Sequence, residues 1–200
     1  MTFTLNQLLA MVGRSIQNPR EGAAEVLSLG IPREALWLIL LIVVVLSVVL
    51  AQLTTILVGG GGGPMFDGLL ASPLVTGGIQ LALLVIMIAA VFFVGRAFGG
   101  TGSFEESMLL MSWLQFIMVC IQVVQTLAML IMPPLAGLIG IAALVLFFWL
   151  MTNFVAVLHG FRSLGQVFVM IIVSGFAIAF FASIVLTILG VGMPMPTGEI

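Results

Sequence analysis

The amino-acid sequence predicts an all-α membrane protein in which five transmembrane helices follow short amphipathic helices at the membrane surface. Hydrophobic residues make up 62% of the 200 residues, and charged residues only 6%. Five apolar runs are each long enough to cross a hydrocarbon core of ~30 Å at a helical rise of ~1.5 Å per residue. Every basic residue is an arginine, and all of them fall in segments that this topology places on one side of the membrane.

The five runs cover residues 35–58, 74–94, 107–132, 135–158 and 166–189. Arginines precede the first run and follow the second and fourth, at Arg14, Arg20, Arg33, Arg96 and Arg162. Because positive charge is retained in the cytoplasm, the N-terminus is expected inside and the C-terminus outside the cytoplasmic membrane. We therefore divide the chain into a cytoplasmic amphipathic segment (1–33), a five-helix membrane domain (34–190) and a short exterior tail (191–200).

The charge balance argues against a polybasic surface. On the predicted cytoplasmic side the arginines are matched by Glu21, Glu25, Glu34, Glu105 and Glu106. A surface that binds nucleic acid needs an excess of basic residues, so the expected surroundings are the lipid bilayer and not nucleic acid. The single cysteine, Cys120, cannot form a disulfide within the chain.

Two amphipathic helices are expected before the first run. Apolar residues recur at helical spacing at Leu5, Leu8, Leu9 and Val12. Thr4 is a candidate N-cap for this helix. In the second helix Asn18 is a good N-cap, Pro19 suits the first position, and Glu21 can reach back to the Asn18 amide. Such helices either form a collar in the headgroup region or serve as a docking arm for a partner.

The connections offer motifs with structural interpretations. Residues 59–63 are consecutive glycines, which we interpret as a flexible outer linker because a phosphate loop needs a lysine that this chain lacks. Ser103 and Glu106 have the spacing of a capping box, and Glu105 adds negative charge at the same helix start. The only histidine, His159, ends the fourth run, and a lone histidine there is more often structural than a metal ligand. No metal, cofactor or catalytic site is predicted.

The third run carries a polar stripe on one helix face, formed by Ser112, Gln115, Gln122 and either Gln125 or Thr126. An amide side chain in hydrocarbon must find a partner. The stripe therefore either joins helices through hydrogen bonds of ~0.6–2 kcal/mol each, or lines a path for a solute. Under the first interpretation, partners are available in neighbouring runs at Gln52, Gln80, Asn153 and Thr187.

Small residues predict close helix contacts in the last two runs. The fourth run begins with Ala136, Gly137, Gly140 and Ala143. The fifth has small residues spaced by four at Gly175, Ala179, Ser183 and Thr187. Small residues at this spacing let helices approach closely. Gly175, Ala179 and Ser183 therefore serve either packing within the bundle or a homodimer interface.

Three stretches resemble the Yip1 family, and in particular its short, bacterial-type members. They are NPREGAAEVLSLGIPREALW at residues 18–37, GRAFGGTGSFEESMLLMSW at 95–113 and FFWLMTNFVAVLHGFRSLGQVFVMII at 147–172. The resemblance implies five helices, a cytoplasmic N-terminus and a role in membrane organisation or partner binding. Eukaryotic members act in vesicle trafficking and contact prenylated small GTPases. The acidic–Leu–aromatic–Gly–Pro segment of those members is missing here, and no catalytic residues are associated with the family.

Together these observations indicate a non-enzymatic membrane-organising or partner-binding protein. The alternative is a small transporter or channel subunit that uses the polar face of the third run; an intramembrane hydrolase ranks third, because a base-activated nucleophile has almost nothing to recruit. An unidentified membrane or cytoplasmic protein is the expected partner. Its predicted docking surface, which we call the partner face, consists of Arg96, Glu105, Glu106, His159 and Arg162.

Overall fold

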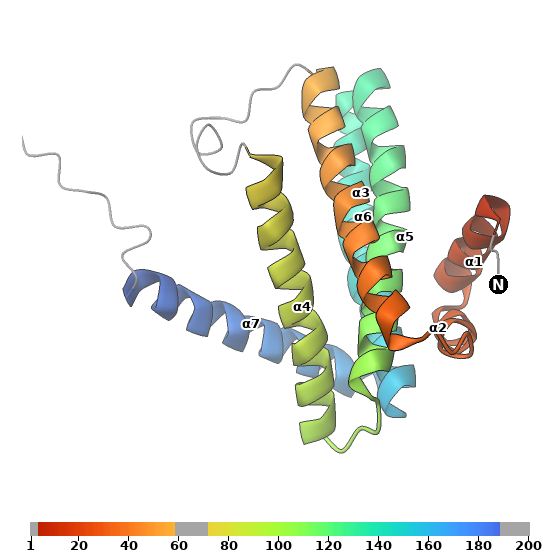
Figure 1. The fold of residues 1–200 in the computed structure, drawn as a ribbon, viewed down its shortest axis with the longest axis vertical. Helices are drawn as coiled ribbons and strands as arrows, with labels where there is room; N and C mark the ends of the chain where they lie inside the picture. The colour runs from red at the N-terminus through yellow and green to blue at the C-terminus, as the bar shows by residue number, and fades with distance from the viewer. Residues whose placement is uncertain (1–3, 59–71, 189–200) are drawn as a thin grey trace, which may run out of the picture.

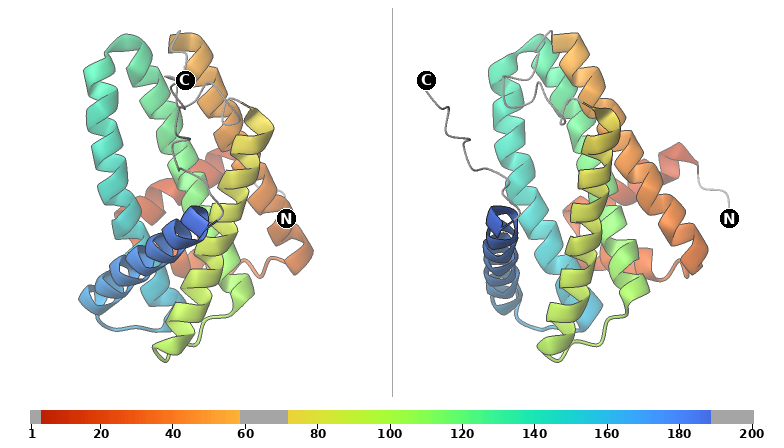
Figure 2. Two further views of the ribbon diagram at one scale, coloured as in Figure 1. Left: turned by 90° about the vertical axis from the view of Figure 1, so that its left-hand side faces the viewer. Right: turned by 60° about the vertical axis from the view of Figure 1, so that its left-hand side comes forward.

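The computed structural model describes residues 4–58 and 72–188 and is helical throughout its regular elements. The helices are α1 (Leu5–Gln17), α2 (Pro19–Leu27), α3 (Arg33–Val58), α4 (Pro73–Ala97), α5 (Phe104–Ile131), α6 (Pro133–His159) and α7 (Leu164–Ile188). Helices α3 to α6 form an up-and-down bundle (Figure 1). The pair α1–α2 lies on one side of the bundle and α7 on the other (Figures 1 and 2). The predicted glycine linker and the exterior tail lie outside the described residues.

Four of the five predicted crossings are confirmed as helices that are long and apolar enough to span a membrane. They cover Arg33–Leu57, Pro73–Ala97, Phe104–Ile131 and Pro133–His159. Large apolar side chains such as Leu38, Val45 and Leu144 remain exposed on their outer surfaces. In a bundle that is surrounded by hydrocarbon this exposure has no cost, because lipid tails are as apolar as the side chains themselves.

Helix α5 is the centre of the bundle. It packs against α3, α4 and α6, and its lower part also contacts α2. Leu110, Met111, Leu114 and Ile117 of α5 are fully buried, as is Phe154 of α6. This core holds the polar side chains of α5 and the ends of α4 and α6 in fixed positions.

Helix α7 departs from the simple five-helix bundle. It lies obliquely across α4 and α6, clearly inclined to the other helices (Figures 1 and 2). Over Leu164–Phe180 it is a shorter apolar helix. Its contacts with the bundle are concentrated near its start, where Val167, Met170 and Ile171 are buried. The fifth crossing therefore stays a prediction.

The predicted helix starts are confirmed with one correction. Thr4 and Gln7 form a capping box at α1, and Ser103 and Glu106 form one at α5. Asn18 precedes Pro19 as expected, but its side chain makes no capping hydrogen bond. The Asn18 amide donates instead to the carbonyl of Arg14, because this one residue also ends α1. That amide is therefore not available to Glu21.

Helices α1 and α2 pack closely at a glycine. A Cβ atom at Gly22 would lie 2.5 Å from Ser15 Oγ and 2.6 Å from Ser15 Cα. Because both distances are well inside van der Waals contact, only glycine fits at this crossing. The two amphipathic helices consequently form a compact hairpin that packs against α5 and α6.

Candidate functional site

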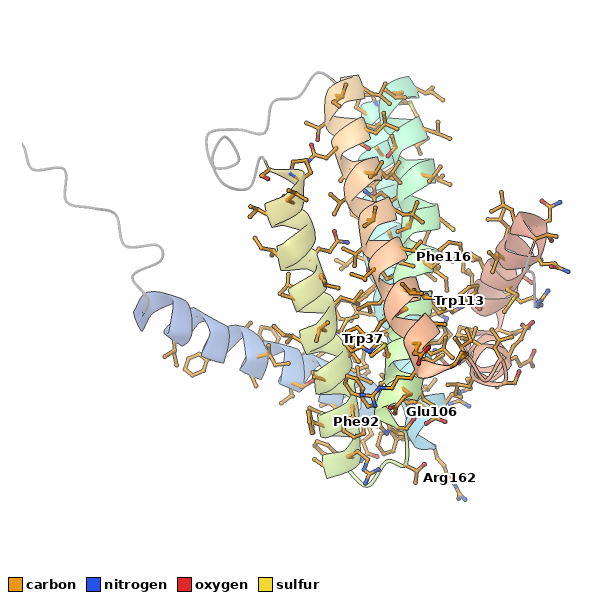
Figure 3. The ribbon with its side chains drawn as sticks, in the orientation of Figure 1. Trp37, Phe92, Glu106, Trp113, Phe116 and Arg162 are labelled. Atoms are coloured by element: carbon orange, nitrogen blue, oxygen red, sulfur yellow. The ribbon has the colours of Figure 1, made fainter. Side chains whose placement is uncertain are left out.

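The charged side chains of the bundle gather at one of its ends. Among the described residues, they lie in α1 and α2, at the starts of α3 and α5, at the end of α4 and just after α6. We call this the charged end. Figure 3 shows Glu106 and Arg162 there, together with Phe92 near the end of α4. The fold thus brings the arginine-bearing connections to one side, as the sequence pattern requires.

His159 joins three segments at the charged end. Its Nδ1 accepts a hydrogen bond of 3.2 Å from the Gly102 amide, in the connection between α4 and α5. Its Nε2 lies 3.1 Å from the carbonyl oxygen of Val91 in α4. Because Nδ1 accepts, the proton must be on Nε2, which donates to Val91. The neutral imidazole therefore ties the end of α6 to α4 and to the following turn.

Glycines make room for this imidazole. A Cβ atom at Gly95 or Gly100 would overlap the His159 ring. A Cβ atom at Gly102 would lie 2.7 Å from Leu158 Cγ. The glycine-rich turn after α4 therefore allows the backbone to approach α6 closely.

The predicted partner face is only partly a surface. Arg96, Glu106 and Arg162 are exposed, and Glu105 is half-exposed. His159 is only 3% exposed and lies behind these residues. This burial was not predictable from the sequence, because a histidine at a helix end is equally compatible with solvent.

Three members of the partner face have a local contact. The Arg96 guanidinium lies 5.9 Å from the centre of the Phe92 ring, and Glu105 Oε1 is 3.8 Å from Arg33 Nε. Glu106 accepts a 2.7 Å hydrogen bond from the Ser103 amide as part of the capping box. Arg162 follows Gly160, which ends α6 with a positive φ of 71°. The arrangement can present fixed charges of both signs, but it holds no acid–base pair.

A second contact region attaches the α1–α2 hairpin to the bundle. The indole N–H of Trp113 donates a 3.0 Å hydrogen bond to Ser15 Oγ, and Ser15 is buried. Within the hairpin, Arg14 donates a 2.6 Å hydrogen bond to Glu25. This hydrogen bond to the Glu25 carboxylate raises the pKa of the Arg14 guanidinium.

The intramembrane polar stripe forms a network between α3, α4 and α5. Ser47 Oγ donates a 3.3 Å hydrogen bond to Gln122 Oε1 and accepts one of 2.9 Å from Gln80 Nε2. Gln122 Nε2 also donates to the Ser47 carbonyl at 3.4 Å. Nearby, the hydroxyls of Thr54 and Thr126 are 2.8 Å apart. Gln122 therefore bonds from helix to helix, but through Ser47, and the predicted partner Gln80 bonds to Ser47 and not directly to Gln122.

The other predicted polar residues behave differently. Gln125 Nε2 donates to the Ala136 carbonyl at 3.2 Å, where Gly140 also leaves room for the amide. Asn153 Nδ2 donates to the Trp149 carbonyl of its own helix at 2.8 Å. Gln115 makes no side-chain hydrogen bond with the part of the chain that the structure describes. Sequence reasoning missed Ser47, although it is a polar residue inside an apolar run.

The small residues of α7 are not used for packing within the bundle over the described side chains. Gly175 and Ala179 are exposed, and a Cβ atom at Gly175 would meet no other atom within 4 Å. Ser183 is also exposed. The homodimer interpretation of this face remains a prediction.

Within the described residues, no three side chains of His, Cys, Asp or Glu lie close enough to hold a metal ion. The model of the Yip1 domain family matches residues 13–186, which is most of the chain. The resemblance predicted from the sequence is thereby confirmed. No curated protein and no solved structure matches the chain.

Proposed function

The chain belongs to the Yip1 family, and from that premise we propose that it binds a protein partner at the charged end of its bundle. Members of this family are multi-pass membrane proteins that are generally not enzymes. We infer that the protein is located in the cytoplasmic membrane, where it organises the membrane or binds a partner. The N-terminus and the partner face then lie in the cytoplasm, and α7 makes the fifth crossing.

The observation that carries this proposal is the rigid display of charge at one end. Arg96 and Glu105 lie on either side of the connection between α4 and α5, which His159 ties to α6 through the Gly102 amide. Arg162 lies on the turn after α6. A surface that is fixed before binding loses little conformational entropy when a partner docks. Charges of both signs also favour a specific orientation of the partner over general attraction.

The hydrogen bonds of Gln122 support the interpretation that the polar stripe joins helices. They argue against the alternative that the stripe lines a path for a solute. The amide is used within the protein, where it joins α5 to α3. A path for a polar solute needs hydrogen-bonding groups that are free to exchange with the solute or with water. We therefore rank the transporter or channel interpretation second.

Site-specific crosslinking in native membranes tests the proposal. Photoreactive residues introduced at Arg96 and Arg162 should give discrete protein adducts. The same residue introduced at Gly61 and Gly192, which lie on the outer side in the proposed topology, should not. Adducts that form only from Gly61 and Gly192 contradict the proposal.

A homodimer through Gly175, Ala179 and Ser183 is tested separately. It would give an adduct of twice the chain mass from a photoreactive residue at Ala179.

A further inference from the structure

An apolar cavity of about 230 Å³ lies between the α1–α2 hairpin and the bundle. Its wall includes Met11 and Val26 from the hairpin, Ile42 and Leu46 from α3, and Trp113 from α5. Figure 3 shows Trp113 and Phe116 on the side of the bundle that faces α1. The hairpin therefore covers a hollow in the bundle that its own side chains do not fill.

One polar atom in this wall has no partner. Ser112 also lines the cavity, and its Oγ is buried without a hydrogen bond in the part of the chain that the structure describes. A buried hydroxyl without a partner costs about 1–3 kcal/mol. The neighbouring indole of Trp113 cannot relieve it, because its N–H already donates to Ser15. The cavity thus combines an apolar lining with a single unused hydrogen-bonding group.

The mouth of the cavity opens onto the membrane-facing surface of α3. Ile42 and Leu46 line it while being 56% and 44% exposed. Both residues belong to a helix that is long and apolar enough to cross a membrane. An occupant that enters here comes from the hydrocarbon layer, and it must be apolar along most of its length.

A cationic residue follows one of the wall residues closely in the sequence. Ile31 lines the cavity, and Arg33 begins α3 two residues later. The Arg33 side chain is 68% exposed, and within residues 4–58 and 72–188 its ionic contact is a long one of 3.8 Å with Glu105. An exposed guanidinium beside a membrane helix is well suited to bind a phosphate, with which it forms charge-assisted hydrogen bonds. Glu105, which Arg33 contacts, lies seven residues before Ser112 in α5. This spacing corresponds to a rise of ~10 Å along the helix.

We propose that this cavity binds one phospholipid of the bilayer. One acyl chain fills the cavity, the Ser112 hydroxyl donates to an ester carbonyl, and the phosphate lies at Arg33. The apolar wall, the unused hydroxyl and the cation occur in the order in which a phospholipid presents its chain, ester and phosphate. The bound lipid then forms part of the contact between the α1–α2 hairpin and the bundle. This site meets the partner face at the contact between Arg33 and Glu105, but the proposal does not depend on a partner binding there.

Fluorescence quenching of Trp113 tests the proposal. The full chain carries Trp37→Phe and Trp149→Phe, which leaves Trp113 as the only tryptophan. It is titrated in detergent micelles with phosphatidylglycerol that is brominated on its acyl chains. A specific site gives quenching that saturates at a low lipid mole fraction. Ser112→Ala should raise the half-saturation point roughly fivefold, as the loss of one hydrogen bond predicts. Arg33→Gln should raise it by a similar factor.

Ile42→Phe narrows the mouth and should weaken the quenching, whereas Val45→Phe, a matched change on an exposed position of α3 outside the cavity wall, should not. Removal of an unpartnered hydroxyl leaves folding intact, so Ser112→Ala remains informative. Quenching that rises in proportion to the lipid content in every variant overturns the proposal. A brominated free fatty acid that saturates at the same mole fraction as the phospholipid, unaffected by Arg33→Gln, also overturns it.

Discussion

His159 illustrates how one buried side chain organises the charged end. Its two nitrogens bond to α4 and to the connection between α4 and α5. The ring fits only because Gly95 and Gly100 leave space for it. A change at either glycine therefore acts on the position of α6.

Replacing Gly95 with alanine should lower the free energy of unfolding by about 1–3 kcal/mol, because the added methyl group overlaps the His159 ring and overpacks the contact. The control is Gly78→Ala in the same helix, where a Cβ atom would meet no atom within 4 Å. Alanine is a better helix former than glycine by roughly 1 kcal/mol, so the control should be neutral or stabilising. The midpoint of thermal unfolding in detergent is measured for both variants. Equal midpoints for the two variants would contradict the His159 contact.

A second prediction at this scale separates two glutamines of α5. Gln122→Leu should destabilise the protein by about 1–2 kcal/mol, because it removes both bonds to Ser47. Gln115→Leu should leave stability unchanged or raise it, since Gln115 has no bond within the described chain to lose. Denaturant unfolding of the two variants gives the comparison. A larger loss for Gln115→Leu would show that this residue has a partner that the fold does not reveal.

Single-residue roles were the least predictable from sequence. The polar stripe predicted that α5 needs partners, but not that Ser47 would supply the central one. A serine inside an apolar run more often bonds to its own helix, as Ser174 does with Ile171. Only the packing of α3 against α5 selects Ser47. The burial of His159 likewise depends on the close approach of a distant turn.

At the scale of elements, the local signals were more reliable. The N-cap at Thr4 and the capping box at Ser103 were predicted because the groups that bond lie within one helical turn of each other. Asn18 differed because the next helix follows without a linker, so one amide had to serve the end of α1. The capping role of a residue that both ends one helix and precedes the next is therefore poorly predicted by rules derived for a single helix.

Gly22 should control the attachment of the α1–α2 hairpin. Gly22→Ala places a methyl group against the backbone of Ser15, which cannot rotate away, so α1 should separate from α2. The hydrogen bond from Trp113 to Ser15 would then be lost. Limited trypsin digestion reports the change, because cleavage after Arg14 needs local opening of α1. Cleavage should become at least several-fold faster.

The matched control for this prediction is Gly13→Ala. Gly13 lies in the same hairpin, but a Cβ atom there would meet no atom within 4 Å. The cleavage rate at Arg14 should remain unchanged or fall, as alanine strengthens the helix. Faster cleavage in both variants would mean that the crossing at Gly22 does not hold the hairpin.

At the scale of the whole molecule, hydropathy and charge were enough to predict four crossings and the gathering of charge at one end. Hydropathy and charge are read segment by segment from the sequence, so these predictions do not require knowledge of how the helices pack. The orientation of α7 was not predictable, because it depends on contacts with α4 and α6. Its exposed residues include Phe168, Val169, Phe176 and Ile178, which lie on several sides of the helix. A helix that is apolar all round belongs in hydrocarbon, since it has no polar face for an interface.

The fifth crossing is therefore the most informative prediction about the molecule. At ~1.5 Å per residue, the 25 residues of α7 span ~37 Å. This length exceeds the ~30 Å hydrocarbon core, so even a tilted α7 can cross it. A C-terminal alkaline phosphatase fusion should then be active, and a C-terminal green fluorescent protein fusion dark. Fusions that replace everything after Ser163 should show the opposite pattern, because they end before α7. If both positions report the cytoplasm, α7 does not cross and lies within the inner half of the membrane. If both report the outside, the arginines do not set the orientation.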